Sequence, residues 1–326
     1  MVALFKQHTI ATAAAIVFLA LVLKAPLFWH IPSDISLQGF DRVFRYTVNP
    51  LSHFMKQASY AYLALSVLAI MAWALYVNHV SNDEKLFPRS NFFPALLVVL
   101  LSSYPLTTQV FSMPFVAHAL VFVALAKTFQ LPATTKPRRK SFDIGFLLAL
   151  AALCYPPAIV FMPFFIFFLR MVRAIRAEEI SAFILGFLMP IYAYLAYALS
   201  VGKLQRSLHA LQVWFKFRPQ PIPLKPLVAI GVFYALLWLY TFFRRNSAQW
   251  QPSAAAKKKW SVLYWFLLPS LACALCTNPF PGLAWMFVVS PFSLLCSLCF
   301  TNIREKYNTF AFYFMMAALL AMVWLL

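Results

Sequence analysis

Long apolar runs alternate with short polar connections along the whole chain. A helix that crosses a membrane needs about 20 mostly apolar residues, and shorter helices suffice where protein surrounds them. On this rule the pattern predicts eleven spans, at 9–28, 59–78, 91–104, 109–127, 141–155, 157–173, 180–201, 226–243, 260–276, 283–300 and 308–326. The third and fifth are short and end at prolines, so each either crosses fully or forms a half-helix. The predicted fold is an all-α, polytopic transmembrane helix bundle.

The composition agrees with an integral membrane protein. Hydrophobic residues make up 63% and charged residues 11% of the 326 positions, and the mean hydropathy is +0.78. Such a chain cannot cover a water-soluble domain with a polar surface. No polar block exceeds roughly 30 residues, whereas a separate soluble domain usually needs about 50. We therefore expect a single integral membrane domain over residues 1–326, with function in the bundle and its loops.

The positions of Lys and Arg predict the orientation, because cytoplasmic loops are enriched in these residues. With the N-terminus inside, every even-numbered connection is basic, including the PRRK and KKK clusters. Eleven spans then make the chain N-in and C-out. The net charge of +19 is explained mainly by topology and by phospholipid contact, so nucleic-acid binding is not indicated.

A second set of cations falls on the outer side, against the usual bias. It consists of Lys24, Arg42, Arg45, Lys56, Lys203, Arg206, Lys216, Arg218 and Lys225, and the outer acids are Asp34 and Asp41. Most of these charges lie in two loops, 28–60 and 202–226. In both loops apolar residues recur at helical spacing opposite the charged ones, which is typical of interfacial helices in the headgroup plane. Anchoring of the bundle is the simplest role for such helices.

The two basic outer loops also fit a site for a lipid-linked phosphate, because Arg and Lys neutralise and hydrogen-bond phosphate oxygens. The candidate ligands are Arg42, Arg45, Lys56, Arg206, His209 and Arg218. Asp34 or Asp41 could deprotonate an acceptor hydroxyl or hold a divalent metal. Each has a structural alternative, since Asp34 follows Pro32 as a helix N-cap and Asp41 can pair with Arg45 four residues on. Both alternatives stay open.

Two further patterns favour structure over chemistry. Cys273, Cys276, Cys296 and Cys299 form two CxxC pairs. On antiparallel spans these pairs would be on the order of 20 Å apart, too far for one zinc ion, so we interpret them as small residues in helix packing. We interpret His118, which lies inside a span, as a hydrogen-bonding residue between helices, with a proton relay as the alternative.

The stretch from Leu86 to Leu199 resembles known families. Its segments LFPRSNFFPALLVVLLSSYPLTTQVFSMPFVAHALVFVALAK, SFDIGFLLALAALCYPPAIVFMPFFIFFLRMV and ISAFILGFLMPIYAYLAYAL resemble an uncharacterised family of multipass inner-membrane proteins from Bacteroidota. The order of spans is similar to the membrane bundle of the GT-C superfamily of glycosyltransferases, which use polyprenyl-phosphate sugars. The resemblance implies a location in the inner membrane of a Gram-negative bacterium.

The resemblance also implies a catalytic acid in the first outer loop, which here would be Asp34 or Asp41. Arg42, Arg45, Arg206 and Arg218 would hold the donor phosphate. The chain departs from the pattern, because this loop has no adjacent Asp-Asp or Asp-Glu pair and no soluble outer C-terminal domain is expected. Two functions therefore stay open: a lipid-linked glycosyltransferase, or a non-catalytic scaffold or accessory subunit of a cell-envelope membrane complex.

Overall fold

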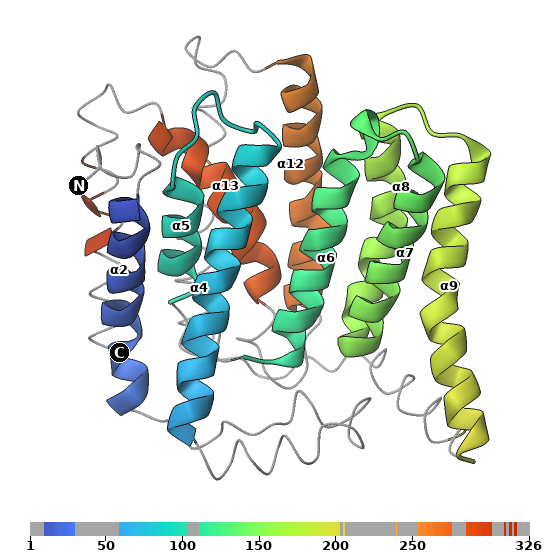
Figure 1. The fold of residues 1–326 in the computed structure, drawn as a ribbon, viewed down its shortest axis with the longest axis horizontal. Coiled ribbons are helices and arrows are strands. Elements are labelled where there is room, and N and C mark those ends of the chain that lie inside the picture. The colour runs from blue at the N-terminus through green and yellow to red at the C-terminus, as the bar shows by residue number, and fades with distance from the viewer. Residues whose placement is uncertain are drawn as a thin grey trace.

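The computed structural model describes residues 10–29, 59–103, 111–202, 253–275 and 285–301, together with positions 205, 239, 310, 313, 314, 316 and 317. These residues form helices and contain no strand. The helices stand side by side, and the chain runs up and down between the two ends of the bundle (Figure 1). The predicted all-α class is confirmed.

The helices coincide with most of the predicted spans. They are α2 (Ile10–Trp29), α4 (Ser59–Asp83), α5 (Phe93–Leu101), α6 (Met113–Phe129), α7 (Pro137–Cys154), α8 (Phe161–Val172), α9 (Ala177–Ser200), α12 (Ala254–Leu275) and α13 (Met286–Thr301), with short 3-10 helices η3 (Leu131–Ala133) and η4 (Pro156–Val160). The predicted spans 226–243 and 308–326 and both outer loops lie outside the described residues, apart from single positions.

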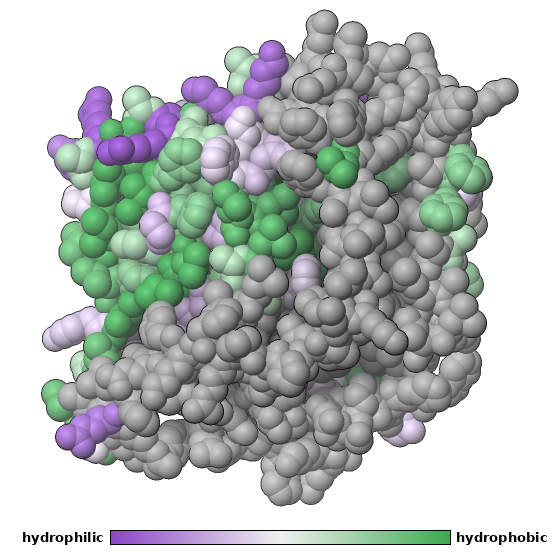
Figure 2. Space-filling model, turned by 180° about the vertical axis from the view of Figure 1, so that it is seen from behind, coloured by the Kyte–Doolittle hydropathy of each residue, from purple (hydrophilic) through white to green (hydrophobic). Residues whose placement is uncertain are grey.

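Two of the described helices are long and apolar enough to cross a membrane. They are α4, over Tyr60–Asp83, and α9, with mean hydropathies of 1.9 and 1.8. The apolar parts of α2, α6, α8 and α13 are shorter. From behind, hydrophilic side chains gather along one edge of the molecule above a broad hydrophobic band (Figure 2). These features indicate membrane association, while the number of crossings and their sidedness stay predictions.

The third predicted span is a half-length helix. α5 has 9 residues, all of them buried. At 1.5 Å per residue α5 rises only about 13.5 Å, less than half of the roughly 30 Å of a hydrocarbon core. The fifth predicted span is longer than expected, because Pro137 begins α7, which then has 18 residues.

Proline sets the start of several helices. Pro94, Pro114, Pro137 and Pro156 each occupy the first turn of their helix. There the fixed φ of proline suits the helix, and its missing N–H would have had no partner. Tyr155, before Pro156, is extended with φ −144° and ψ 95°, as expected for a residue that precedes proline. This break ends α7 and separates it from α8.

Two glycines let α7 and α9 pack backbone to backbone. A Cβ added at Gly145 of α7 would lie 2.9 Å from the Phe187 nitrogen of α9 and closer still to the Phe183 carbonyl oxygen. A Cβ at Gly186 of α9 would lie 2.9 Å from the Phe142 carbonyl carbon of α7. The contact is therefore reciprocal, and it uses small residues to bring helices together as membrane bundles do.

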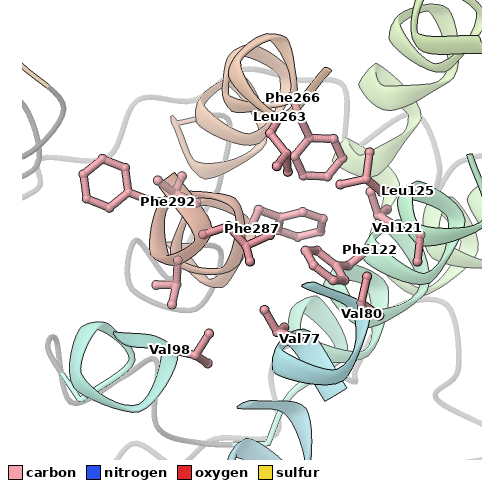
Figure 3. Packing of buried hydrophobic residues seen from close by; sticks show 14 of the residues in the cluster. Val77, Val80, Val98, Val121, Phe122, Leu125, Leu263, Phe266, Phe287 and Phe292 are labelled. Atoms are coloured by element: carbon pink, nitrogen blue, oxygen red, sulfur yellow. The ribbon is translucent and has the colours of Figure 1, made fainter. Parts of the chain in front are cut away.

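Aromatic and branched side chains fill the centre of the bundle. Phe287 of α13 points between α12 and α6, toward Phe266 and Phe122 (Figure 3). The rings of Phe161 and Phe287 stack with their centroids 5.6 Å apart, and Phe161 packs on Phe266 at 5.0 Å. Such pairs stabilise the core beyond the apolar area they bury. They fix α8, α12 and α13 to one another.

Candidate functional site

The predicted catalytic and phosphate-binding residues lie outside the described part of the chain. They are Asp34, Asp41, Arg42, Arg45, Lys56, Arg206, His209 and Arg218. The described helices next to them show where the loops begin. α2 ends, α4 starts and α9 ends at the same end of the bundle (Figure 1). The segments 30–58 and 203–252 therefore both leave the described helices from this end, which we call the loop end.

Lys24 is a buried cation close to the loop end. It lies on the last turns of α2, and its side chain is 0% exposed. Its Nζ has no hydrogen-bond partner among the described residues. A buried ammonium without a partner is energetically costly, and ionisable groups inside membrane helices are functional candidates for that reason. An anionic group placed beside Lys24 would remove this cost.

Two side chains of α4 hold the backbone of Phe111, just before α6. The Tyr62 hydroxyl donates to the Phe111 carbonyl oxygen, and the Phe111 N–H donates to Ser66 Oγ at 3.0 Å. The Ser66 hydroxyl donates in turn to the Tyr62 carbonyl oxygen at 2.8 Å. Backbone groups of a connection that the protein covers need such hydrogen-bond partners. The contacts fix the start of α6 against α4.

Ser290 of α13 joins α4 and α6 inside the bundle. The indole N–H of Trp73 donates to Ser290 Oγ at 2.9 Å, and His118 Nε2 lies 2.8 Å from the same oxygen. The His118 ring packs edge-on against Trp73 and Phe287, with centroids 5.2 and 5.3 Å apart. All three polar residues are buried. The prediction that His118 hydrogen-bonds between helices is confirmed.

This cluster has only part of what hydrolysis requires. In a catalytic triad a carboxylate orients the imidazole from its second nitrogen. Here His118 Nδ1 has no hydrogen-bond partner in the described residues, and aromatic rings enclose the pair. The arrangement therefore fits a polar link that fixes three helices. Sequence reasoning missed Ser290 and Trp73, although an indole N–H within an apolar span generally needs a partner.

The opposite end of the bundle carries a set of ion pairs. Four of them join Lys127–Asp143 (3.0 Å), Arg138–Glu178, Arg173–Glu179 (2.9 Å) and Lys259–Glu84 (2.6 Å), and the fifth, His79–Asp83 (3.2 Å), is ionic only when His79 is protonated. Each carboxylate within the described ranges belongs to one of these pairs. The PRRK and KKK clusters, at residues 137–140 and 257–259, lie in the first turns of α7 and α12 at this end (Figure 1).

The turn that ends α4 is closed by its own backbone. The N–H of Leu86 donates to the Ser81 carbonyl oxygen at 3.0 Å, and the N–H of Lys85 donates to the Asn82 carbonyl oxygen at 3.1 Å. Lys85 has a positive φ of 48°. This is the Schellman pattern, in which a left-handed residue satisfies the last carbonyls of a helix. Trp260 of α12 then donates its indole N–H to the Leu86 carbonyl oxygen at 3.1 Å.

Residues 44–324 of the chain match a family model that is described as "Family of unknown function (DUF6427)". The chain belongs to the DUF6427 family. The DUF6427 match includes every described helix from α4 to α13, and with them Trp73, His118, Ser290 and the ion pairs. Asp34, Asp41, Arg42 and Lys24 precede it. No curated protein and no solved structure matches the chain.

Proposed function

We propose that this chain is a multipass inner-membrane protein that binds a lipid-linked phosphate at its loop end, on the outer face. The ligand would be a polyprenyl-phosphate sugar or a phospholipid. The observation that best supports the proposal is Lys24, whose ammonium is 0% exposed and has no hydrogen-bond partner in the described part of the chain. A phosphate oxygen would give this ammonium a charge-assisted hydrogen bond.

The surroundings of Lys24 suit a lipid. On α2, which carries Lys24, and on the neighbouring α4, the side chains of Phe18, Leu21, Tyr60 and Leu65 are 69%, 51%, 63% and 49% exposed, which gives an isoprenoid or acyl chain an apolar surface. In the proposal, Arg42, Arg45, Lys56, Arg206, His209 and Arg218 add further contacts to the phosphate. Sugar transfer, by analogy with the GT-C bundle, would use Asp34 or Asp41 as the base.

Replacement of Lys24 tests the binding step. The full chain is purified from its native membrane, and the lipids that stay bound are identified by mass spectrometry. We expect Lys24→Met to lose the phosphate-bearing lipid by about tenfold or more, while Lys24→Arg keeps it. Lys136→Gln, which changes an exposed cation at the other end, is the matched control. Equal retention of the lipid by Lys24→Met and wild type would contradict the proposal.

The scaffold function is the second candidate, and one observation favours it. Every described carboxylate already contacts a basic side chain, so the proposed acid–base chemistry would depend on Asp34 and Asp41. The test changes these two residues to Asn, singly and together, and follows envelope glycan and glycolipid composition in cells. An altered profile supports transfer. An unchanged profile at normal protein levels supports the scaffold, and lipid binding through Lys24 is measured separately.

A further inference from the structure

A pocket of about 540 Å³ opens beside the last turns of α4, at the end opposite Lys24. Its lining comes from α4 and from the connection that follows it. The lining residues are Leu75, Asn78, His79, Asn82, Asp83, Ser90 and Phe92. The lining thus combines amide, imidazole, carboxylate and hydroxyl groups with the apolar side chains of Leu75 and Phe92.

Asn78 provides a hydrogen-bond acceptor that the described residues do not use. Asn78 is 2% exposed, and its Oδ1 has no hydrogen-bond partner in the described structure. The neighbouring Asn82, by contrast, is engaged in structure, because its Oδ1 accepts from the Asn91 N–H at 3.3 Å and its Nδ2 donates to the Asn91 carbonyl oxygen at 3.4 Å. A buried amide oxygen left unpaired costs free energy, so a donor supplied by a ligand would be stabilising.

The pocket is also electronegative. Asp83 is the last residue of α4, and the C-terminus of a helix already carries partial negative charge. The nearby acid Glu84 is neutralised by Lys259 at 2.6 Å, whereas the partner of Asp83 is the His79 imidazole, 3.2 Å from Oδ2, which offsets the negative charge only when it is protonated. The described lining residues include no Lys or Arg. A cation would therefore be favoured here over an anion.

The form of the cation follows from the rest of the lining. The described residues hold no group of three His, Cys, Asp or Glu side chains that could bind a metal. A primary ammonium can donate three hydrogen bonds, and a trimethylammonium none. Leu75 and Phe92 add apolar side chains to the lining, and α4 is a candidate membrane span that ends at the pocket. We propose that this pocket binds the primary ammonium headgroup of an aminophospholipid through Asp83 and Asn78.

Native mass spectrometry of the full chain in detergent tests this site. The probes are phosphatidylethanolamine, phosphatidylcholine with the same acyl chains, and soluble phosphoethanolamine. We expect wild type to retain phosphatidylethanolamine at least about tenfold better than phosphatidylcholine, because only the former donates hydrogen bonds. Asp83→Asn should lose this preference. The exposed acid Glu178, at the same end but outside the pocket, gives the control variant Glu178→Gln, which should keep it.

A second variant, which blocks the pocket sterically, separates loss of binding from loss of the fold. Leu75 lines the pocket and is 40% exposed, so Leu75→Trp should fill the pocket without entering the core. It should abolish retention of phosphatidylethanolamine while the thermal unfolding curve stays close to that of wild type. Equal retention of the two phospholipids by wild type, or unchanged retention in both Asp83→Asn and Leu75→Trp, would overturn the proposal. Binding of soluble phosphoethanolamine as strong as that of the lipid would overturn the assignment to a phospholipid.

Discussion

Lys259 of α12 places its ammonium 2.6 Å from the carboxylate of Glu84 and 3.0 Å from the Glu84 carbonyl oxygen. One side chain thus neutralises an acid and caps the C-terminal end of α4, where a cation is favoured by the helix dipole. Both side chains are largely buried, at 14% and 9% exposed. The contact joins segments 175 residues apart in the sequence, so it couples the first half of the bundle to the second.

Lys259→Gln should therefore destabilise the protein by about 2 kcal/mol, because Glu84 would stay largely buried without its charge partner. Thermal unfolding in a mild detergent, followed by tryptophan fluorescence, measures the change. Lys258→Gln is the control, since Lys258 only reaches the Val172 carbonyl oxygen at 3.5 Å. Adding Glu84→Gln to Lys259→Gln should recover part of the loss. A loss in Lys258→Gln as large as that in Lys259→Gln would contradict this assignment.

Lys85→Gly should stabilise the protein by about 1 kcal/mol, because a residue with a side chain is strained in the left-handed region and glycine is not. Lys85 has a φ of 48°. The matched control is Lys136→Gly, where φ is −121° and glycine brings no relief. The same unfolding measurement applies. Equal shifts for the two variants, or a loss of stability in Lys85→Gly, would show that Lys85 is not strained.

Gly145→Ala and Gly186→Ala should each destabilise the protein by about 2 kcal/mol or more, because the new methyl group meets backbone atoms of the facing helix. The sign of the stability change is informative, because without such a clash alanine is more favourable than glycine in a helix by about 1 kcal/mol. Ala196→Gly, at an exposed position of α9, should cost only about that amount. A rise in thermal stability in either glycine variant would mean that α7 and α9 do not meet there.

Ser290→Ala should cost about 1–3 kcal/mol, because it leaves the buried Trp73 N–H and His118 Nε2 without their shared partner. Unfolding in detergent and the emission wavelength of the tryptophans report the change. Ser293→Ala, which removes only a hydrogen bond to the Ser290 carbonyl oxygen within the same helix, should cost less. Trp73→Phe should cost less in the Ser290→Ala background than in wild type, because the hydrogen bond is already lost there, whereas equal losses in the two backgrounds would show that the two residues are not coupled.

The sequence pattern predicted the helical class and the positions of α4 and α9 well, because both are long apolar runs with clear polar ends. It placed the starts of α7 and α12 too late. The PRRK and KKK clusters were interpreted as connections, but residues 137–140 and 257–259 are helical. A cluster of charged residues does not by itself end a helix. Arg138, for example, pairs from within α7 with Glu178 of the neighbouring α9.

The internal contacts could not be derived from the sequence pattern. His118 was recognised as a polar residue within a span, but its partner Ser290 lies 172 residues away. Periodicity shows which residues share a face of one helix, and it does not show which helices meet. The pocket beside α4 was missed for the same reason, because Ser90 and Phe92 reach it from a connection. The predicted residues from Asp34 to Lys56 lie outside the described residues and stay predictions.

The short helix α5 has a consequence for biosynthesis. The helices that enclose α5 include α4, which is synthesised just before it, and α13. Phe93 of α5 packs on Phe300 of α13 with the ring centroids 6.5 Å apart. Because α13 emerges from the ribosome long after α5, this fully buried helix would wait for much of its enclosure until translation is nearly over. A chain that stops before residue 286 should thus leave α5 accessible to proteases and quality-control machinery, even when all earlier helices have formed.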